Sequence, residues 1–75
     1  MKTIFEEIGE KIIHYIEKHQ ISQTEFAERI GVSKQVMSKI VKGQKATNIE
    51  EIKKIADVMN ISVDELVHHE SETNV

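Results

Sequence analysis

The stretch SQTEFAERIGVSKQVMSKIVKG, residues 22–43, decides the fold of this chain. It contains two short amphipathic segments, each introduced by a serine and followed by a glycine. Ser22 and Ser33 are of the residue type that caps helix N-termini. Gly31 and Gly43 can adopt the left-handed conformation that ends a helix without a Cβ penalty. The stretch therefore predicts two short helices joined by a tight turn.

Helix starts elsewhere in the chain carry the same kind of signal. The capping-box pattern Ser/Thr-x-x-Glu satisfies free backbone N–H groups at both ends of the first helical turn. It occurs at Thr3–Glu6, Ser22–Glu25, Thr47–Glu50 and Ser62–Glu65. With the apolar periodicity, it predicts helices over 4–19, 23–30, 34–42, 49–59 and 63–67. The chain contains no proline, and we expect an all-α, five-helix domain over residues 1–67 with a polar, disordered tail over 68–75.

The composition excludes several classes of protein. The 75 residues include no cysteine, which rules out disulfides and thiolate metal sites. No apolar run approaches the length of a membrane span, so we expect a cytoplasmic protein that does not contact a membrane. The four histidines are His14, His19, His68 and His69. Their spacing favours solvent-facing roles over metal binding, and with no convergent catalytic set we expect neither a cofactor nor an enzyme.

Charge is distributed unevenly along the chain. The net charge is −3, yet residues 33–45 hold four lysines and no acidic residue. The other six basic residues are outnumbered by all 13 acidic ones. Phosphate attraction is screened over roughly 8–10 Å and therefore responds to local charge. The sequence predicts one basic face on an otherwise acidic protein.

The segment after Ser33 has the side chains of a DNA-reading helix. At about 100° per residue, Met37 and Ile40 share one face and polar residues share the other. Amide and ammonium groups can bond adenine and guanine edges in the major groove, and a valine can contact a thymine methyl. The candidate base-reading residues are Lys34, Gln35, Val36 and Lys39. The candidate phosphate contacts, which fix register without reading sequence, are Gln23, Ser38, Lys42, Gln44 and Lys45.

These motifs resemble the lambda-repressor-like, Cro-type helix-turn-helix family. The likeness is carried by IGEKI at 8–12, ISQTEFAERIGVSKQVMSKI at 21–40, Gly43 and IEEIKKIADVMNISVDEL at 49–66. The resemblance implies a five-helical domain in which the second and third helices form the helix-turn-helix. It also implies a cytoplasmic regulator, a repressor acting as a homodimer on palindromic operator DNA, with residues 34–42 in the major groove.

The chain departs from the family pattern at a paired position. Where relatives often carry an arginine late in the first helix and a glutamate near the end of the recognition helix, this chain has Ile16 and Val41. Replacing both partners of a buried ion pair by packed apolar residues is often neutral or stabilising. We therefore expect Ile16 to contact Val41. A third departure is Thr47, at a position where the family often has proline.

Two predictions concern partners other than DNA. A single half-site contact is too short to specify an operator, so we expect a homodimer formed through the fifth helix (Val63, Leu66, Val67) and Ile13. The alternative reading is a protein-interaction module on the same fold, such as an antitoxin or a domain that sequesters a regulator.

Overall fold

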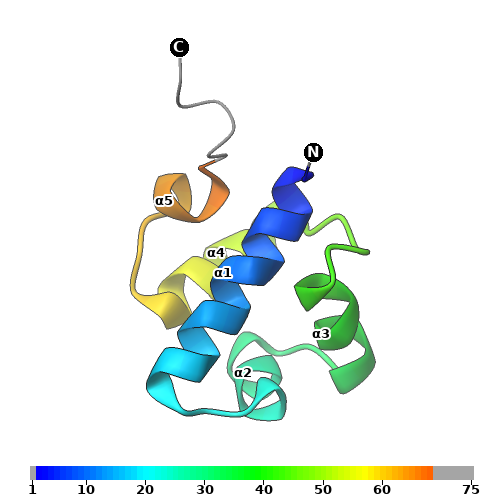
Figure 1. Cartoon of the computed structure of the whole chain (residues 1–75), viewed down its shortest axis with the longest axis vertical. Helices are drawn as coiled ribbons and strands as arrows, with labels where there is room; N and C mark the ends of the chain where they lie inside the picture. Colours follow the sequence, from blue (N-terminus) through cyan, green and yellow to red (C-terminus); the bar gives the residue numbers. More distant parts are fainter. Residues whose placement is uncertain (1, 69–75) are drawn as a thin grey trace.

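The computed structural model describes residues 2–68, which form five helices and no strand. The helices are α1 (Ile4–His19), α2 (Gln23–Ile30), α3 (Lys34–Val41), α4 (Ile49–Met59) and α5 (Val63–Val67). Figure 1 shows α1 crossing the middle of the molecule, with α3 on one side and α5 on the other. The expected all-α, five-helix fold is confirmed. The tail predicted at 68–75 lies outside the described residues, except for His68.

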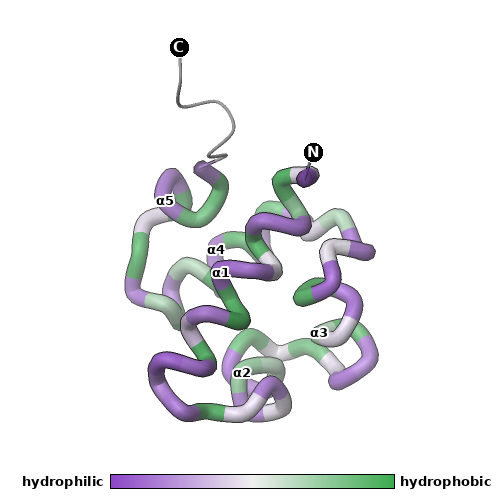
Figure 2. The backbone as a smooth tube through the Cα atoms, in the orientation of Figure 1, coloured by the Kyte–Doolittle hydropathy of each residue, from purple (hydrophilic) through white to green (hydrophobic). Residues whose placement is uncertain are grey.

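One apolar core joins all five helices. Green and purple alternate along α1 and α4 in Figure 2, as expected of amphipathic helices. Side chains of this kind contribute about 1.5–3 kcal/mol each when a Val, Leu, Ile, Phe or Met is fully buried. The buried members are Ile8, Ile12, Ile16, Phe26, Ala27, Ile30, Met37, Ile40, Ile55, Ala56 and Leu66.

Most of the predicted helix ends are confirmed. Thr3 and Ser62 form full capping boxes with Glu6 and Glu65. At α2 the box is only half formed: the Ser22 hydroxyl accepts from the Glu25 N–H, while the Glu25 carboxylate pairs with Arg29 at 2.7 Å. An arginine one turn later competes for that carboxylate, and the sequence pattern does not weigh this competition.

The predicted bounds of α4 are confirmed, but its predicted N-cap is wrong by one residue. Asn48, not Thr47, is the N-cap, and its partner in the capping box is Glu51 rather than Glu50. Both pairs have the required spacing, so burial decides between them. Thr47 is 8% exposed, and its hydroxyl has no hydrogen-bond partner within the described part of the chain. The shift also leaves Ile49 at the first helical position, 58% exposed rather than in the core.

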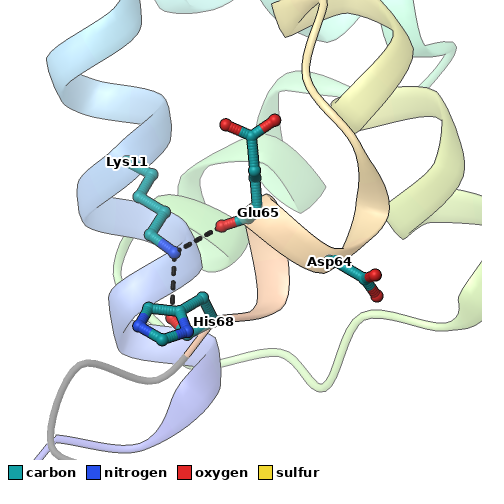
Figure 3. A pocket seen from close by; sticks show the side chains of 4 residues that line it. All are labelled: Lys11, Asp64, Glu65 and His68. Atoms are coloured by element: carbon teal, nitrogen blue, oxygen red, sulfur yellow. Dashed lines mark hydrogen bonds between the residues drawn. The ribbon is translucent and has the colours of Figure 1, made fainter. Parts of the chain in front are cut away.

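Helix α5 is held against α1 by a lysine. The Lys11 ammonium donates to the backbone carbonyls of Glu65, Leu66 and His68 at 2.9, 3.0 and 2.9 Å. Figure 3 shows the side chain reaching from α1 to the end of α5. A cation at a helix C-terminus satisfies its free carbonyls and complements the helix dipole. Lys11 therefore supplies the cap that this five-residue helix lacks in its own sequence.

Candidate nucleic-acid interface

The turn between α2 and α3 brings these helices together as the sequence predicts. Gly31 has φ +76°, and its N–H donates to the Glu28 carbonyl at 3.2 Å. The next residue, Val32, donates its N–H to the Ala27 carbonyl at 3.0 Å. Ala27 is 2% exposed, which fits a close approach between the two helices. The chain therefore leaves α2 sharply and enters α3 with its direction fixed.

Helix α3 buries one face and exposes the other. Met37 and Ile40 are almost fully buried, while Lys34, Gln35 and Lys39 are exposed. The Ser33 hydroxyl accepts from the Val36 N–H at 3.2 Å, and no acidic residue stands in the first turn. The helix ends at Val41, with Lys42 as its C-cap instead of its last residue. An acid-free row of donors thus faces solvent along α3.

The other candidate contacts surround this row with differing exposure. Lys42 and Gln44 are exposed, and Gln23 and Ser38 are half-buried. Val36 is half-buried and packs against the core, so less of its side chain is available to a base than the sequence suggested. The remaining candidate, Lys45, forms an ion pair with Glu51 of α4.

Lys45 forms the one partly buried ion pair near α3 among residues 2–68. Its ammonium lies 2.8 Å from Oε1 of Glu51, and the two side chains are 30% and 16% exposed. Burial alone would raise the pKa of Glu51. The hydrogen bonds from Lys45 and the Asn48 N–H, with the charges of Lys45 and Lys54, outweigh burial and lower that pKa below its ordinary value. Lys45 is therefore not the unpaired charge that the sequence predicts, because its acidic partner comes from a separate helix.

Helix α1 sets the position of α3 through two glycines. A Cβ built on Gly9 would lie 2.4 Å from the Val41 carbonyl oxygen and 2.8 Å from that of Ile40. A Cβ on Gly43 would lie 2.7 Å from the backbone Cα of Glu6. The end of α3 therefore rests directly on the backbone of α1. Sequence reasoning did not assign Gly9 a role, although a glycine inside a helical pattern is itself a signal of close packing.

The predicted dimer surface needs one correction. Leu66 is fully buried in the monomer core and is not available to a partner, whereas Val63 and Val67 are half-buried. Ile13 follows Gly9 by four residues and so shares the side of α1 that meets α3. Lys11, which holds α5, lies almost opposite around the helix. The two predicted parts of the surface are therefore on different sides of α1.

The expected contact between Ile16, which is buried, and Val41, which packs against the core, stays a prediction.

Other kinds of site find little support in the described residues. A pocket of about 470 Å³ beside α5 is lined by Lys11, Asp64, Glu65 and His68, but the three N–H donors of Lys11 already serve backbone carbonyls. Over residues 2–68, no three His, Cys, Asp or Glu side chains are grouped as metal ligands would be; His69 lies outside this range. Within the same range, no helix has the length and apolar character needed to cross a bilayer.

Comparison with known proteins bears on the whole arrangement. The model of a family described as "Helix-turn-helix" matches residues 12–66. Comparison with curated proteins gave no match. Among solved structures, the chain is similar to the clp gene regulator ClgR from Corynebacterium glutamicum, with a TM-score of 0.78 and 20% sequence identity over 88% of this chain and 70% of that one. At this identity the likeness concerns the fold. The family match, which covers most of the chain and includes both α2 and α3, shows that this protein belongs to the lambda-repressor-like helix-turn-helix family.

Proposed function

We propose that this chain is a sequence-specific DNA-binding transcriptional regulator that inserts α3 into the major groove. The observation that carries the proposal is the exposed face of α3. Lys34, Gln35 and Lys39 face solvent there with no acidic residue on the helix, while the opposite face is locked into the core. A rigidly held helix of this kind presents its N-terminal residues to base edges. Membership of the family and the fold shared with a gene regulator support the same function.

The proposed contacts with DNA are of two kinds, those that read bases and those that bind phosphates. Lys34, Gln35, Val36 and Lys39 read bases, with Gln35 suited to adenine and the lysines to guanine. Gln23, Ser38, Lys42, Gln44 and Lys45 contact phosphates and fix the register. Gln23 begins α2, whose free backbone N–H groups add a place for a phosphate. As the family resemblance implies, the protein acts as a repressor. Its site is palindromic, because two copies are needed to read enough sequence.

Selection of bound sequences from a random DNA pool tests this function directly. We expect a short enriched half-site repeated with two-fold symmetry at a spacing of about one helical turn. Lys39→Ala should change the preferred base at one position and cost about 1–3 kcal/mol on the selected site. Lys42→Ala should weaken binding to all sequences alike and reduce the salt slope by about 0.9. An unenriched pool, together with a co-purifying protein partner, would instead support an interaction module.

The dimer is tested separately. We propose that Val63 and Val67 on α5 contribute to it, since they are half-buried in the monomer. Sedimentation of the free protein and of its complex with a palindromic duplex should reveal two copies. A monomer at high micromolar concentration in both states would contradict the homodimer without affecting the assignment of α3.

A further inference from the structure

The ion pair between Lys45 and Glu51 ties the loop after α3 to the start of α4. Oε1 of Glu51 accepts from Lys45 at 2.8 Å and from the Asn48 N–H at 3.0 Å. The same carboxylate therefore completes the capping box of α4 and binds the last lysine of the basic segment. Both side chains are partly withdrawn from solvent, where charges are screened less than on an open surface.

This pair differs from the rest of the basic face. Among the described residues, Lys34, Lys39 and Lys42 form no ion pair with an acidic side chain, and α3 itself carries no acid. Capping α4 does not require Glu51 to be charged, because a glutamine at the third helical position can accept the same hydrogen bond. The Glu51 carboxylate lies within ion-pair distance of Lys45, and the lowered pKa of Glu51 agrees with a carboxylate that is ionised in this setting.

We propose that Glu51 limits the affinity of this protein for DNA by neutralising Lys45. The inference rests on the proposed function, since it concerns the strength of the same interface. A phosphate that approaches Lys45 meets a pair with no net charge, so the contact displaces little condensed counterion. Lys45 still has two N–H donors free of Glu51, and it touches the backbone without adding a full unit of charge to binding. Affinity is thereby held below the value that four free lysines would give.

A set of matched variants tests the proposal. Glu51→Gln removes the charge and keeps an oxygen that can accept from both Lys45 and Asn48. Glu50→Gln, at the exposed neighbouring position on α4, changes the net charge by the same amount without touching the pair. Lys45→Ala and the double variant Glu51→Gln/Lys45→Ala complete a cycle. Dissociation constants on a selected duplex and on random duplex DNA are measured over a range of salt concentrations.

We expect Glu51→Gln to bind both duplexes about tenfold more tightly at ~50 mM salt, with a salt slope steeper by about 0.9. Glu50→Gln should have a smaller effect on both quantities. Lys45→Ala alone leaves the charge of Glu51 uncompensated and should weaken binding to both duplexes, whereas the double variant, which removes both charges, should bind about as the unaltered protein does and so lose the gain of Glu51→Gln. Circular dichroism establishes that each variant is folded. Should Glu51→Gln not fold, Glu51→Ala takes its place, because the Asn48 side chain still caps the backbone N–H of residue 51, and binding no tighter than that of Glu50→Ala overturns the inference.

The outcomes separate the two proposals. If the unaltered protein binds DNA and Glu51→Gln binds no better than Glu50→Gln, the inference about Glu51 is wrong and the proposed function stands. If the unaltered protein binds neither duplex at any salt concentration, the proposed function fails and the inference fails with it.

Discussion

At the scale of single residues, Thr47 is the clearest departure from an optimised sequence. Its hydroxyl is buried without a hydrogen-bond partner in the described residues, whereas its neighbour Asn48 performs the capping. An unpaired buried hydroxyl carries a desolvation cost that an apolar group of similar shape avoids. We expect Thr47→Val to raise the free energy of unfolding by about 1 kcal/mol. Urea titration followed by circular dichroism measures this change.

Thr24 provides the control for this substitution. It is exposed on α2, so Thr24→Val removes a hydroxyl that is already solvated and should stay within about 0.5 kcal/mol of the unaltered protein. A loss of stability in Thr47→Val would mean that the hydroxyl has a partner after all, such as a bound water molecule.

At the scale of helices, the support of α3 by α1 depends on the absence of a side chain at Gly9. Alanine is normally the better helix former by about 1 kcal/mol. Here its Cβ would lie 2.4 Å from the backbone oxygen of Val41, and backbone cannot move aside as a flexible side chain can. We expect Gly9→Ala to lower the free energy of unfolding by about 2–3 kcal/mol and to weaken DNA binding because α3 is displaced.

Gly31→Ala separates steric contact from backbone strain. Among residues 2–68, a Cβ at Gly31 meets only the Lys54 ammonium, at 3.9 Å, so its cost arises from the positive φ. We expect a loss of about 1–2 kcal/mol there. A Gly9→Ala variant that is more stable than the parent would show that α3 does not rest on α1 in solution.

Helix α5 depends on α1 in a different way. Lys11→Met keeps the aliphatic stem and removes the ammonium that binds three carbonyls at the end of α5. We expect a loss of about 1–3 kcal/mol in the free energy of unfolding. Hydrogen exchange should show faster opening of α5 than of α2 in this variant. Lys18→Met, on an exposed part of α1, is the matched control and should have little effect on either measurement.

The helices themselves follow from local sequence, and their contacts with one another do not. The bounds of α1 and α2 agree with prediction because serine and threonine caps and apolar periodicity act within one helical turn. The capping pattern places the N-cap of α4 at Thr47 instead of Asn48, because two overlapping capping boxes are equally good locally and only the burial of Thr47 distinguishes them. Leu66 was assigned to a dimer surface because periodicity shows an apolar face without showing what covers it.

In the candidate site, too, local features could be predicted from the sequence and contacts between helices could not. The exposed row on α3 follows from helical spacing, so Lys34, Gln35 and Lys39 face solvent as expected. The pairing of Lys45 with Glu51 and the contact of Gly9 with α3 join separate elements. Such contacts depend on how helices pack, and a single sequence gives no measure of that packing.

At the scale of the whole molecule, the response of stability to acid is linked to the basic face. The pKa of Glu51 is lower in the folded protein than its ordinary value, so the folded state is stabilised while this carboxylate is ionised. That contribution is present above about pH 4.3, the ordinary value for glutamate, and is lost as pH falls through the folded pKa. Lys45→Ala should therefore destabilise the protein at pH 7 more than at acidic pH.

Urea unfolding at neutral pH and near pH 3 measures this difference. Lys18→Ala, which removes a lysine outside any ion pair among residues 2–68, should show no comparable dependence on pH. A difference between Lys45→Ala and the parent that is the same at both pH values would show that the ion pair does not stabilise the folded state.

The contact between Gly43 and the backbone of Glu6 has a practical consequence for anyone handling this protein. The first turn of α1 lies against the loop that leaves α3, as Figure 1 shows for the N-terminal end of the chain. A bulky label on the first turn of α1 would therefore stand beside the surface we propose for DNA and obstruct it. A label on α5, on the other side of α1 from α3, keeps that surface clear. Binding data from the two labelled proteins should be compared before either is used to measure affinity.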